Sequence, residues 1–188
     1  MKEINYKYFK NVLKNAEFTD EQCEICSSNI NCLEGEYFSE DGKYSSICLE
    51  CLRKGLAKVE IPNYLRKSID VNIRENNKIL SESEIKIIYN EKIKELEITP
   101  PVPWIQYNNW AICCGDFATY IGEWSQEDFI ANSKQVDSIT YFENLLEDST
   151  RKKIDDINVL WNDIGQNTAA FVFKCENCQK YIVICQSY

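Results

Sequence analysis

The sequence WIQYNNWAICCGDFATYIGEW, residues 104–124, is the most informative part of this chain. It places three tryptophans, two tyrosines and one phenylalanine around the turn Cys113-Cys114-Gly115-Asp116. Aromatic side chains bury more surface than any others, so this stretch should lie inside the protein. We predict a strand, a turn and a second strand here, with an unusual pair of adjacent cysteines at the turn.

Two predictions compete for the side chains of this turn. In an extended run alternate residues share a face, so Cys114 and Asp116 would point together and Cys113 would point away. Gly115, however, lets the backbone turn, which would bring Cys113 round instead. The conformation of the turn therefore decides which side chains meet a common ligand.

The C-terminal segment AAFVFKCENCQKYIVICQ predicts a strand, a Cys-x-x-Cys knuckle and a second strand. Such a knuckle is half of a zinc-ribbon site and needs a partner pair. We therefore predict that Cys175 and Cys178 share a zinc ion with Cys114 and with either Cys113 or Asp116. We favour the closed shell of four sulfurs, whereas Asp116 or water would make an open site.

Two further Cys-x-x-Cys pairs occur earlier in the chain, at Cys23 and Cys26 and at Cys48 and Cys51. This is the spacing of structural zinc sites with four cysteine ligands. The alternatives are four free thiols or two redox-active pairs. We prefer zinc and so expect two zinc ions per chain.

The surroundings of the first four cysteines predict a small zinc fold. Asp41-Gly42 predicts a hairpin turn between the two pairs. Residues Leu49 to Val59 predict a short helix, so a treble-clef or ribbon arrangement follows. The remaining cysteines, Cys32 and Cys185, are predicted to be core residues because a free cysteine behaves as a small buried apolar side chain.

Composition excludes several classes of function. The chain carries a net charge of −9, which disfavours nucleic acid and suits a basic protein partner. It contains no histidine, so Ser-His, Cys-His and HExxH sites are excluded. No phosphate-binding glycine loop occurs. We find no signal peptide or membrane span and expect a cytoplasmic protein, in which cysteines bind metal more often than they form disulfides.

The rest of the chain predicts an aromatic N-terminal arm and several helices. Residues 1–22 should pack Tyr6, Tyr8 and Phe9 onto the body, and residues 60–80 are expected to be a connection. Ser81 and Glu84 form a capping box before an amphipathic helix, whose stripe suits the core or a partner. Later helices are predicted after Ser125, around Tyr141–Leu146, and through Ile154, Ile157, Leu160, Trp161 and Ile164.

With these motifs in view, the chain resembles the CbrC family of bacterial proteins, whose name refers to tolerance of colicin E2. The resemblance runs from the first knuckle to the last. It rests on Cys48-Leu-Glu-Cys51 leading to Gly55, on Thr99-Pro100 followed by Trp104, on Trp110-x-x-Cys113-Cys114-x-Asp116, on Ile121-Gly122, and on Phe171-x-Phe173-x-Cys175. Family members commonly have His and Cys where this chain has Cys113 and Ala118. The first exchange keeps a zinc ligand.

We therefore predict an α+β fold with small antiparallel β elements, two zinc knuckle sites and several packed helices. Residues 1–65 should form a four-cysteine zinc lobe, 66–98 a connection and amphipathic helix, and 99–188 an aromatic and knuckle lobe, within one compact unit. The predicted function is a zinc-binding protein without catalysis that binds another protein or confers tolerance of a toxin or stress. The alternative is a metal- or thiolate-dependent enzyme that uses the turn at Cys113-Cys114-Asp116.

Overall fold

The computed structural model describes residues 4–35, 38, 44–134 and 136–188 of the chain. Its helices are α1 (Val12–Asn15), α2 (Leu49–Arg53), α3 (Asn63–Asn76), α4 (Glu82–Glu97), α5 (Gln126–Ser133), α6 (Ser138–Leu145), α7 (Asp148–Arg151) and α8 (Ile157–Asp163). Its strands are β1 (Phe18–Thr19), β2 (Cys32–Glu34), β3 (Ser46–Cys48), β4 (Ile112–Cys113), β5 (Asp116–Phe117), β6 (Thr119–Glu123), β7 (Thr168–Lys174) and β8 (Tyr181–Ser187). All strand pairs in the sheets are antiparallel, which confirms the α+β prediction. The predicted turn at Asp41-Gly42 lies outside the described residues.

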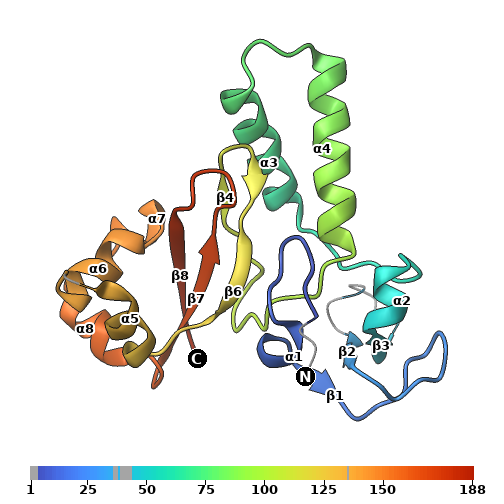
Figure 1. Cartoon of the computed structure of the whole chain (residues 1–188), viewed down its shortest axis with the longest axis horizontal. Coiled ribbons are helices and arrows are strands. Elements are labelled where there is room, and N and C mark those ends of the chain that lie inside the picture. The colour runs from blue at the N-terminus through green and yellow to red at the C-terminus, as the bar shows by residue number, and fades with distance from the viewer. Residues whose placement is uncertain (1–3, 36–37, 39–43, 135) are drawn as a thin grey trace.

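The sheet β6-β7-β8 stands at the centre of the molecule and separates two hydrophobic cores (Figure 1). Along its middle strand, Phe171 and Phe173 join the larger core, whereas Ala170 and Val172 join the smaller one. Successive side chains of a strand point to opposite faces, so the continuous apolar run of β7 is that of a strand buried on both sides. The predicted strand, knuckle and strand of the C-terminal segment are confirmed.

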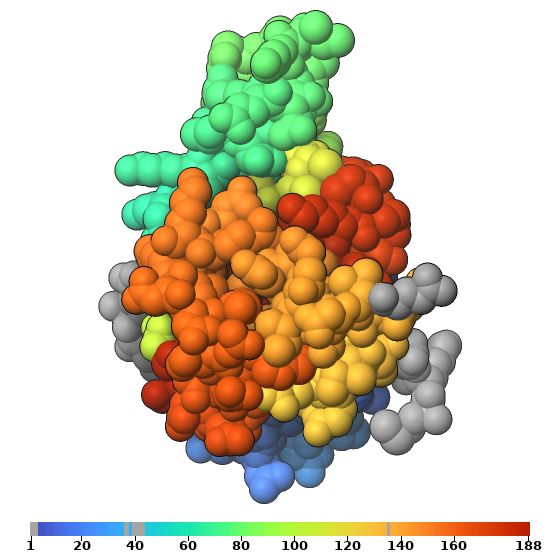
Figure 2. Space-filling model, turned by 90° about the vertical axis from the view of Figure 1, so that its left-hand side faces the viewer, coloured from blue at the N-terminus to red at the C-terminus, as the bar shows by residue number. Residues whose placement is uncertain are grey.

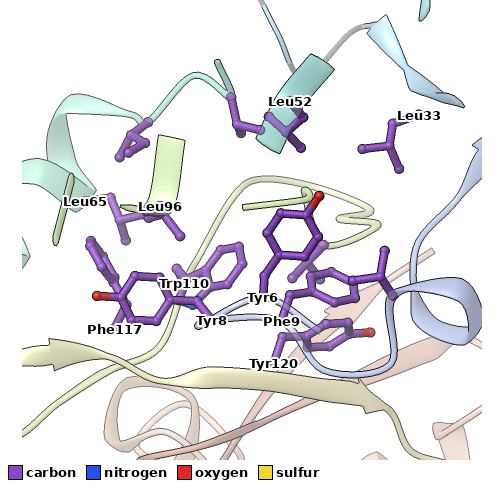
Figure 3. Packing of buried hydrophobic residues seen from close by; sticks show 14 of the residues in the cluster. Tyr6, Tyr8, Phe9, Leu33, Leu52, Leu65, Leu96, Trp110, Phe117 and Tyr120 are labelled. Atoms are coloured by element: carbon purple, nitrogen blue, oxygen red, sulfur yellow. The ribbon is translucent and has the colours of Figure 1, made fainter. Parts of the chain in front are cut away.

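The N-terminal arm packs into the larger core, as the sequence predicted. Tyr6, Tyr8 and Phe9 are buried between β6 below and the helices α2 and α4 above (Figure 3). Phe9 meets Tyr120 of β6 edge to face, with ring centroids 4.9 Å apart, and Tyr8 meets Phe117 in the same way at 5.6 Å. The arm thus connects the central sheet to the N-terminal half of the chain.

Short segments cover both edges of the central sheet. Beside β6, the Tyr120 N–H donates to the Tyr8 carbonyl (2.8 Å), and the Lys10 N–H donates to the Tyr120 carbonyl (2.9 Å). Beside β8, the Glu147 N–H donates to the Val183 carbonyl (3.0 Å). Backbone groups that a sheet edge would leave open are therefore paired on each side.

The smaller core lies under α5, α6 and α8, which face the viewer in Figure 2. Phe129, Phe142 and Trp161 pack there with ring centroids 5.0 to 6.1 Å apart. The predicted cap at Ser125 is confirmed as a capping box with Asp128. The last predicted helix is shorter than expected, because Asp156 accepts a hydrogen bond from the Asn158 N–H and starts α8 after Ile154.

The predicted connection over residues 60–80 is wrong for most of its length, since α3 occupies Asn63–Asn76. Leu65, Ile69 and Ile73 recur every four residues and are buried on one face of this helix. With α4, which begins at the predicted capping box on Ser81, α3 forms a helical hairpin that projects from the body (Figures 1 and 2). No helix among the described residues is long and apolar enough to cross a membrane.

Two predicted elements are shorter in the structure. The aromatic stretch begins its first strand only at Ile112, and residues 104–111 follow a proline-rich segment without a strand. The helix after the second cysteine pair ends at Arg53, because Gly55 follows with a φ of 67°.

The larger core draws residues from all three predicted segments, for example Leu33, Ile93 and Phe171. How far these segments fold independently stays a prediction.

Candidate metal centres

The knuckle at Cys23 and Cys26 is a tight turn closed by two backbone hydrogen bonds. The Cys23 N–H donates to the Ser28 carbonyl (2.8 Å), and the Ser27 N–H donates to the Cys23 carbonyl (2.7 Å). Ser27 adopts a φ of 58°, in the left-handed region that lets the chain reverse after the second cysteine. The turn presents both sulfurs to the same side.

The partner sulfurs come from the end of β3 and the first turn of α2. Cys48 is the N-cap of α2, and its Sγ accepts a hydrogen bond from the Cys51 N–H (3.5 Å). A knuckle, two paired strands and a helix N-terminus therefore converge on one point. Of the two predicted arrangements, treble clef and ribbon, these elements resemble the treble clef.

The first cluster consists of Cys23, Cys26, Cys48 and Cys51, whose sulfurs all lie within 4.8 Å of one another. The Sγ atoms of Cys26 and Cys48 are 3.5 Å apart. A disulfide would need about 2.0 Å, whereas four sulfurs around a tetrahedral zinc at about 2.3 Å stand about 3.8 Å apart. The donor set and its spacing fit zinc. Cys23, Cys48 and Cys51 are buried, and Cys26 is exposed.

Cys32 lies beside the first cluster but outside it. It pairs with Cys48 across β2 and β3, and its thiol donates to the Ser28 carbonyl at 3.2 Å. Since neighbouring strands place paired residues side by side, this proximity alone does not make Cys32 a ligand. The prediction of a buried core cysteine is confirmed, with 1% of its surface exposed.

The second knuckle repeats the backbone geometry of the first. The Cys175 N–H donates to the Lys180 carbonyl (2.9 Å), and the Gln179 N–H donates to the Cys175 carbonyl (2.8 Å). Gln179, like Ser27 at the same place in the first knuckle, is left-handed with a φ of 62°. The two knuckles are thus the same local structure, connecting β1 to β2 in one case and β7 to β8 in the other.

The adjacent cysteines occupy a tight hairpin. Cys113 of β4 pairs with Asp116 of β5, so Cys114 and Gly115 are the two residues of the turn. Both have positive φ, 53° and 72°, as the type I′ turn requires. Cys113 is therefore the last residue before the turn and Cys114 is the first residue of the turn. The alternation of side chains along an extended strand does not apply to this pair.

The second cluster consists of Cys113, Cys114, Cys175 and Cys178, again with all sulfurs within 4.8 Å of one another. The Cys113 sulfur lies 3.6 Å from that of Cys114 and 3.6 Å from that of Cys178. The turn at Gly115 has brought Cys113 round, so the sulfur geometry is that of the closed alternative. That these eight cysteines bind metal stays a prediction, and the donor sets fit two zinc ions.

Asp116, the alternative ligand, is directed elsewhere. Its Oδ1 accepts a hydrogen bond from the Tyr8 hydroxyl (2.7 Å), and its Oδ2 pairs with the Lys92 ammonium (2.8 Å). Burial alone would raise the pKa of this carboxyl, but the Lys92 and Tyr8 contacts outweigh burial and lower it. Asp116 thus connects the hairpin to the N-terminal arm and to α4.

Sequence reasoning missed the support that α3 gives to this hairpin. The Gly115 N–H donates to the Asn72 side-chain oxygen (2.7 Å). A Cβ at Gly115 would stand 3.4 Å from the Cβ of Asn76, so the turn lies directly against the helix. The four-residue repeat of Leu65, Ile69 and Ile73 was the available signal for α3, but nothing in the sequence linked Asn72 to the turn.

Burial and backbone hydrogen bonds give the thiols of each cluster different pKa values. Burial would raise the pKa of the Cys23 thiol, yet backbone N–H groups of Cys48, Cys26 and Ile25 lower it to about 6. A backbone N–H of Lys180 lowers the pKa of the Cys178 thiol to about 7. Burial raises the pKa of Cys51 and of Cys113. Each knuckle therefore holds one thiol that ionises readily to a thiolate. The thiolate is the form that binds metal.

Comparison with known proteins places the chain in a family. No curated protein and no solved structure matches it. The resemblance to the CbrC family stays a prediction, since no named relative tests it. A family model described as an uncharacterised protein family, UPF0167, matches residues 4–186. With nearly its whole length matched, the chain belongs to the UPF0167 family.

Proposed function

We propose that each cluster holds one zinc ion through four thiolates, and that the chain is a zinc-stabilised binding protein without catalysis. The observation that carries this proposal is the second cluster, where both cysteines of the hairpin join both cysteines of the knuckle. Zinc with four protein ligands has no position for water or substrate. Catalytic zinc sites keep such a position open.

The contacts of Asp116 also weigh against the enzyme alternative. A carboxylate that activates water must face the metal or the substrate, whereas both oxygens of Asp116 are engaged by Tyr8 and Lys92. The chain has no histidine to replace it as a base. The turn that the enzyme hypothesis depended on therefore serves better as a support for the metal.

Metal content tests the proposal directly. Protein purified without chelator should contain two zinc ions per chain by elemental analysis. Cys48→Ser should reduce this to one and loosen the N-terminal lobe, since the site loses a thiolate. Cys32→Ser is the matched control, because Cys32 is equally buried and pairs with Cys48 across the same strands.

The control variant should keep both zinc ions and the native melting temperature. Zinc-free native protein with ten titratable thiols would refute the proposal. An unchanged zinc content in Cys48→Ser would refute the ligand assignment of the first cluster.

The partner we propose is a basic protein. The net charge of −9 favours encounter with a basic surface and repels nucleic acid. The resemblance to the CbrC family suggests a setting, because colicin E2-type toxins are basic nucleases. Their nuclease domains are therefore the first partner to examine.

A direct binding measurement examines this partner. The zinc-loaded protein should bind a colicin E2-type nuclease domain, and the affinity should fall as salt increases, because charge pairs are screened. An acidic protein of similar size and charge serves as the control for unspecific attraction. If the two acidic proteins bind the nuclease equally, specific recognition of the toxin is refuted.

A further inference from the structure

We propose that the second cluster is an oxidation site, at which a peroxide joins Cys178 to Cys113 and releases zinc while the first cluster keeps its metal. This inference rests on the proposed function, since both clusters must first hold zinc. It assigns the two centres different roles: the first maintains the fold, and the second responds to an oxidant.

Exposure separates the two clusters. In the first, three of the four cysteines are buried within the larger core, with at most 3% of their surface exposed. In the second, Cys114 and Cys178 are exposed, Cys113 is half-buried, and only Cys175 is buried. Oxidation follows the accessibility of a thiolate, so a small oxidant should reach the second cluster first.

A cleft lies beside the second cluster. It has a volume of about 650 Å³ and is lined by Cys113 together with Lys180, Ile182 and residues of the segment after α6. Solvent therefore reaches Cys113 on one side of the hairpin and the exposed Cys178 on the knuckle. The first cluster borders a smaller hollow of about 330 Å³, lined by Cys26 and Cys48.

Two sulfur pairs of the second cluster stand 3.6 Å apart, and the backbone geometry favours one of them as a disulfide. The sulfurs of Cys113 and Cys178 are 3.6 Å apart and belong to separate hairpins, so a small shift joins them. Cys113 and Cys114 are equally close, but they are neighbours in the chain across a trans peptide. Their Cα atoms are about 3.8 Å apart, which is below the range of about 4.4 to 6.8 Å found in disulfides.

The reaction balances with hydrogen peroxide as the oxidant. The Cys178 thiolate attacks one peroxide oxygen, the O–O bond breaks, and hydroxide leaves, which forms a sulfenic acid on Cys178. The Cys113 thiolate then attacks that sulfur and expels the second hydroxide, which forms the disulfide. Two thiolates lose two electrons in all, and the peroxide becomes two hydroxide ions. With Cys113 and Cys178 joined, two of the four thiolates that would hold zinc are gone, so the metal would be released.

The disulfide would keep the β4–β5 hairpin tied to the knuckle, so loss of the metal should loosen only its tip, the turn residues Cys114 and Gly115. Apart from the cluster, the tip is held by the Gly115 N–H to Asn72 bond (2.7 Å) and by the Asn177 amide to the Cys114 carbonyl (3.4 Å). Its base remains fixed, because the Ala118 N–H donates to the Ala111 carbonyl (2.9 Å). The response is therefore local and reversible by a thiol reductant.

The test uses the full chain loaded with two zinc ions. Hydrogen peroxide is added, zinc release is followed with a chromophoric chelator, and disulfides are mapped by mass spectrometry after alkylation. We expect one zinc ion to leave well before the other, a disulfide between Cys113 and Cys178, and recovery of zinc binding after reduction.

Two variants that keep four ligands sharpen the test, since an imidazole nitrogen also binds zinc. Cys113→His removes the sulfur that closes the disulfide and should slow the fast release several-fold. Cys26→His makes the same exchange at the exposed cysteine of the first cluster and should leave the fast release unchanged. Equal slowing by both variants would overturn the proposal.

The outcomes also separate this inference from the proposed function. Fewer than two zinc ions before any oxidant is added would refute the proposed function itself. Two zinc ions that leave together, or that leave without a disulfide at Cys178, would refute only the oxidation site. Release from the first cluster before the second would reverse the assigned roles and refute it as well.

Discussion

Residues with positive φ shape both candidate metal centres. Ser27 and Gln179 reverse the chain after the two knuckles, and Cys114 and Gly115 form the hairpin turn. Three of these four residues carry a side chain in a conformation that costs about 1–2 kcal/mol for an L residue. The strain is retained because four sulfurs must converge on one point, and a bound metal would offset it.

A prediction at Gly115 follows from this strain. Gly115→Ala should weaken zinc binding at the second cluster by up to about tenfold, because about 1–2 kcal/mol of turn strain is relieved when the hairpin opens. Competition with a chelator measures the affinity of each site. Gly165→Ala is the matched control, since Gly165 has a φ of 78° and open space around it.

The control should lose a similar amount of folding stability and keep both zinc affinities. Equal zinc affinity in the two alanine variants would contradict the role of the Gly115 turn in holding the metal.

At the scale of elements, Glu97 joins the end of α4 to two other segments. Its carboxylate pairs with the Lys58 ammonium (2.9 Å) and with the Arg66 guanidinium of α3 (3.0 Å), and 15% of its side chain is exposed. Burial would raise the pKa of Glu97, but these two contacts outweigh burial and lower it. The base of the α3–α4 hairpin is thus fixed by a charge network that neither helix contains alone.

Stability should depend on pH through this carboxyl. The folded pKa of Glu97 lies below its unfolded value of about 4.3, so its contribution is complete above that pH and is lost as pH falls through the folded pKa. Glu97→Gln should cost about 2 kcal/mol at pH 7, and the difference from the native chain should shrink as pH falls below about 4.

Chemical denaturation at several pH values measures this difference. Glu50→Gln is the control, because the Glu50–Lys54 pair is exposed on both sides and should matter little. A difference between Glu97→Gln and the native chain that is independent of pH would contradict the argument.

Elements with strong local signals were predictable from the sequence. The capping boxes at Ser81 and Ser125 start α4 and α5, because a polar cap and an acidic residue three positions later satisfy the first helical N–H groups. The helix α3 was not predicted, because only three of its residues are buried and most of the others are asparagines or charged residues. The hairpin turn was only half predictable, since Gly115 indicated a turn but not the left-handed backbone of Cys114.

On the scale of the whole molecule, the two cores depend on metal to different degrees. Cys23, Cys48 and Cys51 are members of the larger core. Among the described residues, the smaller core contains no cysteine of either cluster and is built mainly from aromatic and aliphatic side chains. The sequence could place Cys113 and Cys114 beside a knuckle more than sixty residues away for one reason. All other cysteine pairs in the chain were already assigned to the first cluster.

Chelation of both zinc ions should therefore loosen one half of the protein before the other. Hydrogen exchange should show that amides of β2, β3 and α2 lose protection, while those of β7, β8 and α5 keep it. The reason is that cysteines of the first cluster form part of the larger core, whereas β7 and β8 pair along their whole length and also pack in the smaller core. Uniform loss of protection across the chain would contradict this division.

The arm that covers the edge of β6 can pack only after distant parts of the chain have been synthesised. Tyr8 and Lys10 are synthesised more than a hundred residues before their partner Tyr120. The first cluster needs no residue after Cys51, whereas the second waits for Cys178, more than sixty residues after Cys113. Contacts between distant residues form slowly, and the nascent arm stays without its partner strand meanwhile. Within this stretch the second knuckle is therefore the last pair of cluster cysteines to be synthesised, and the second cluster cannot form before it.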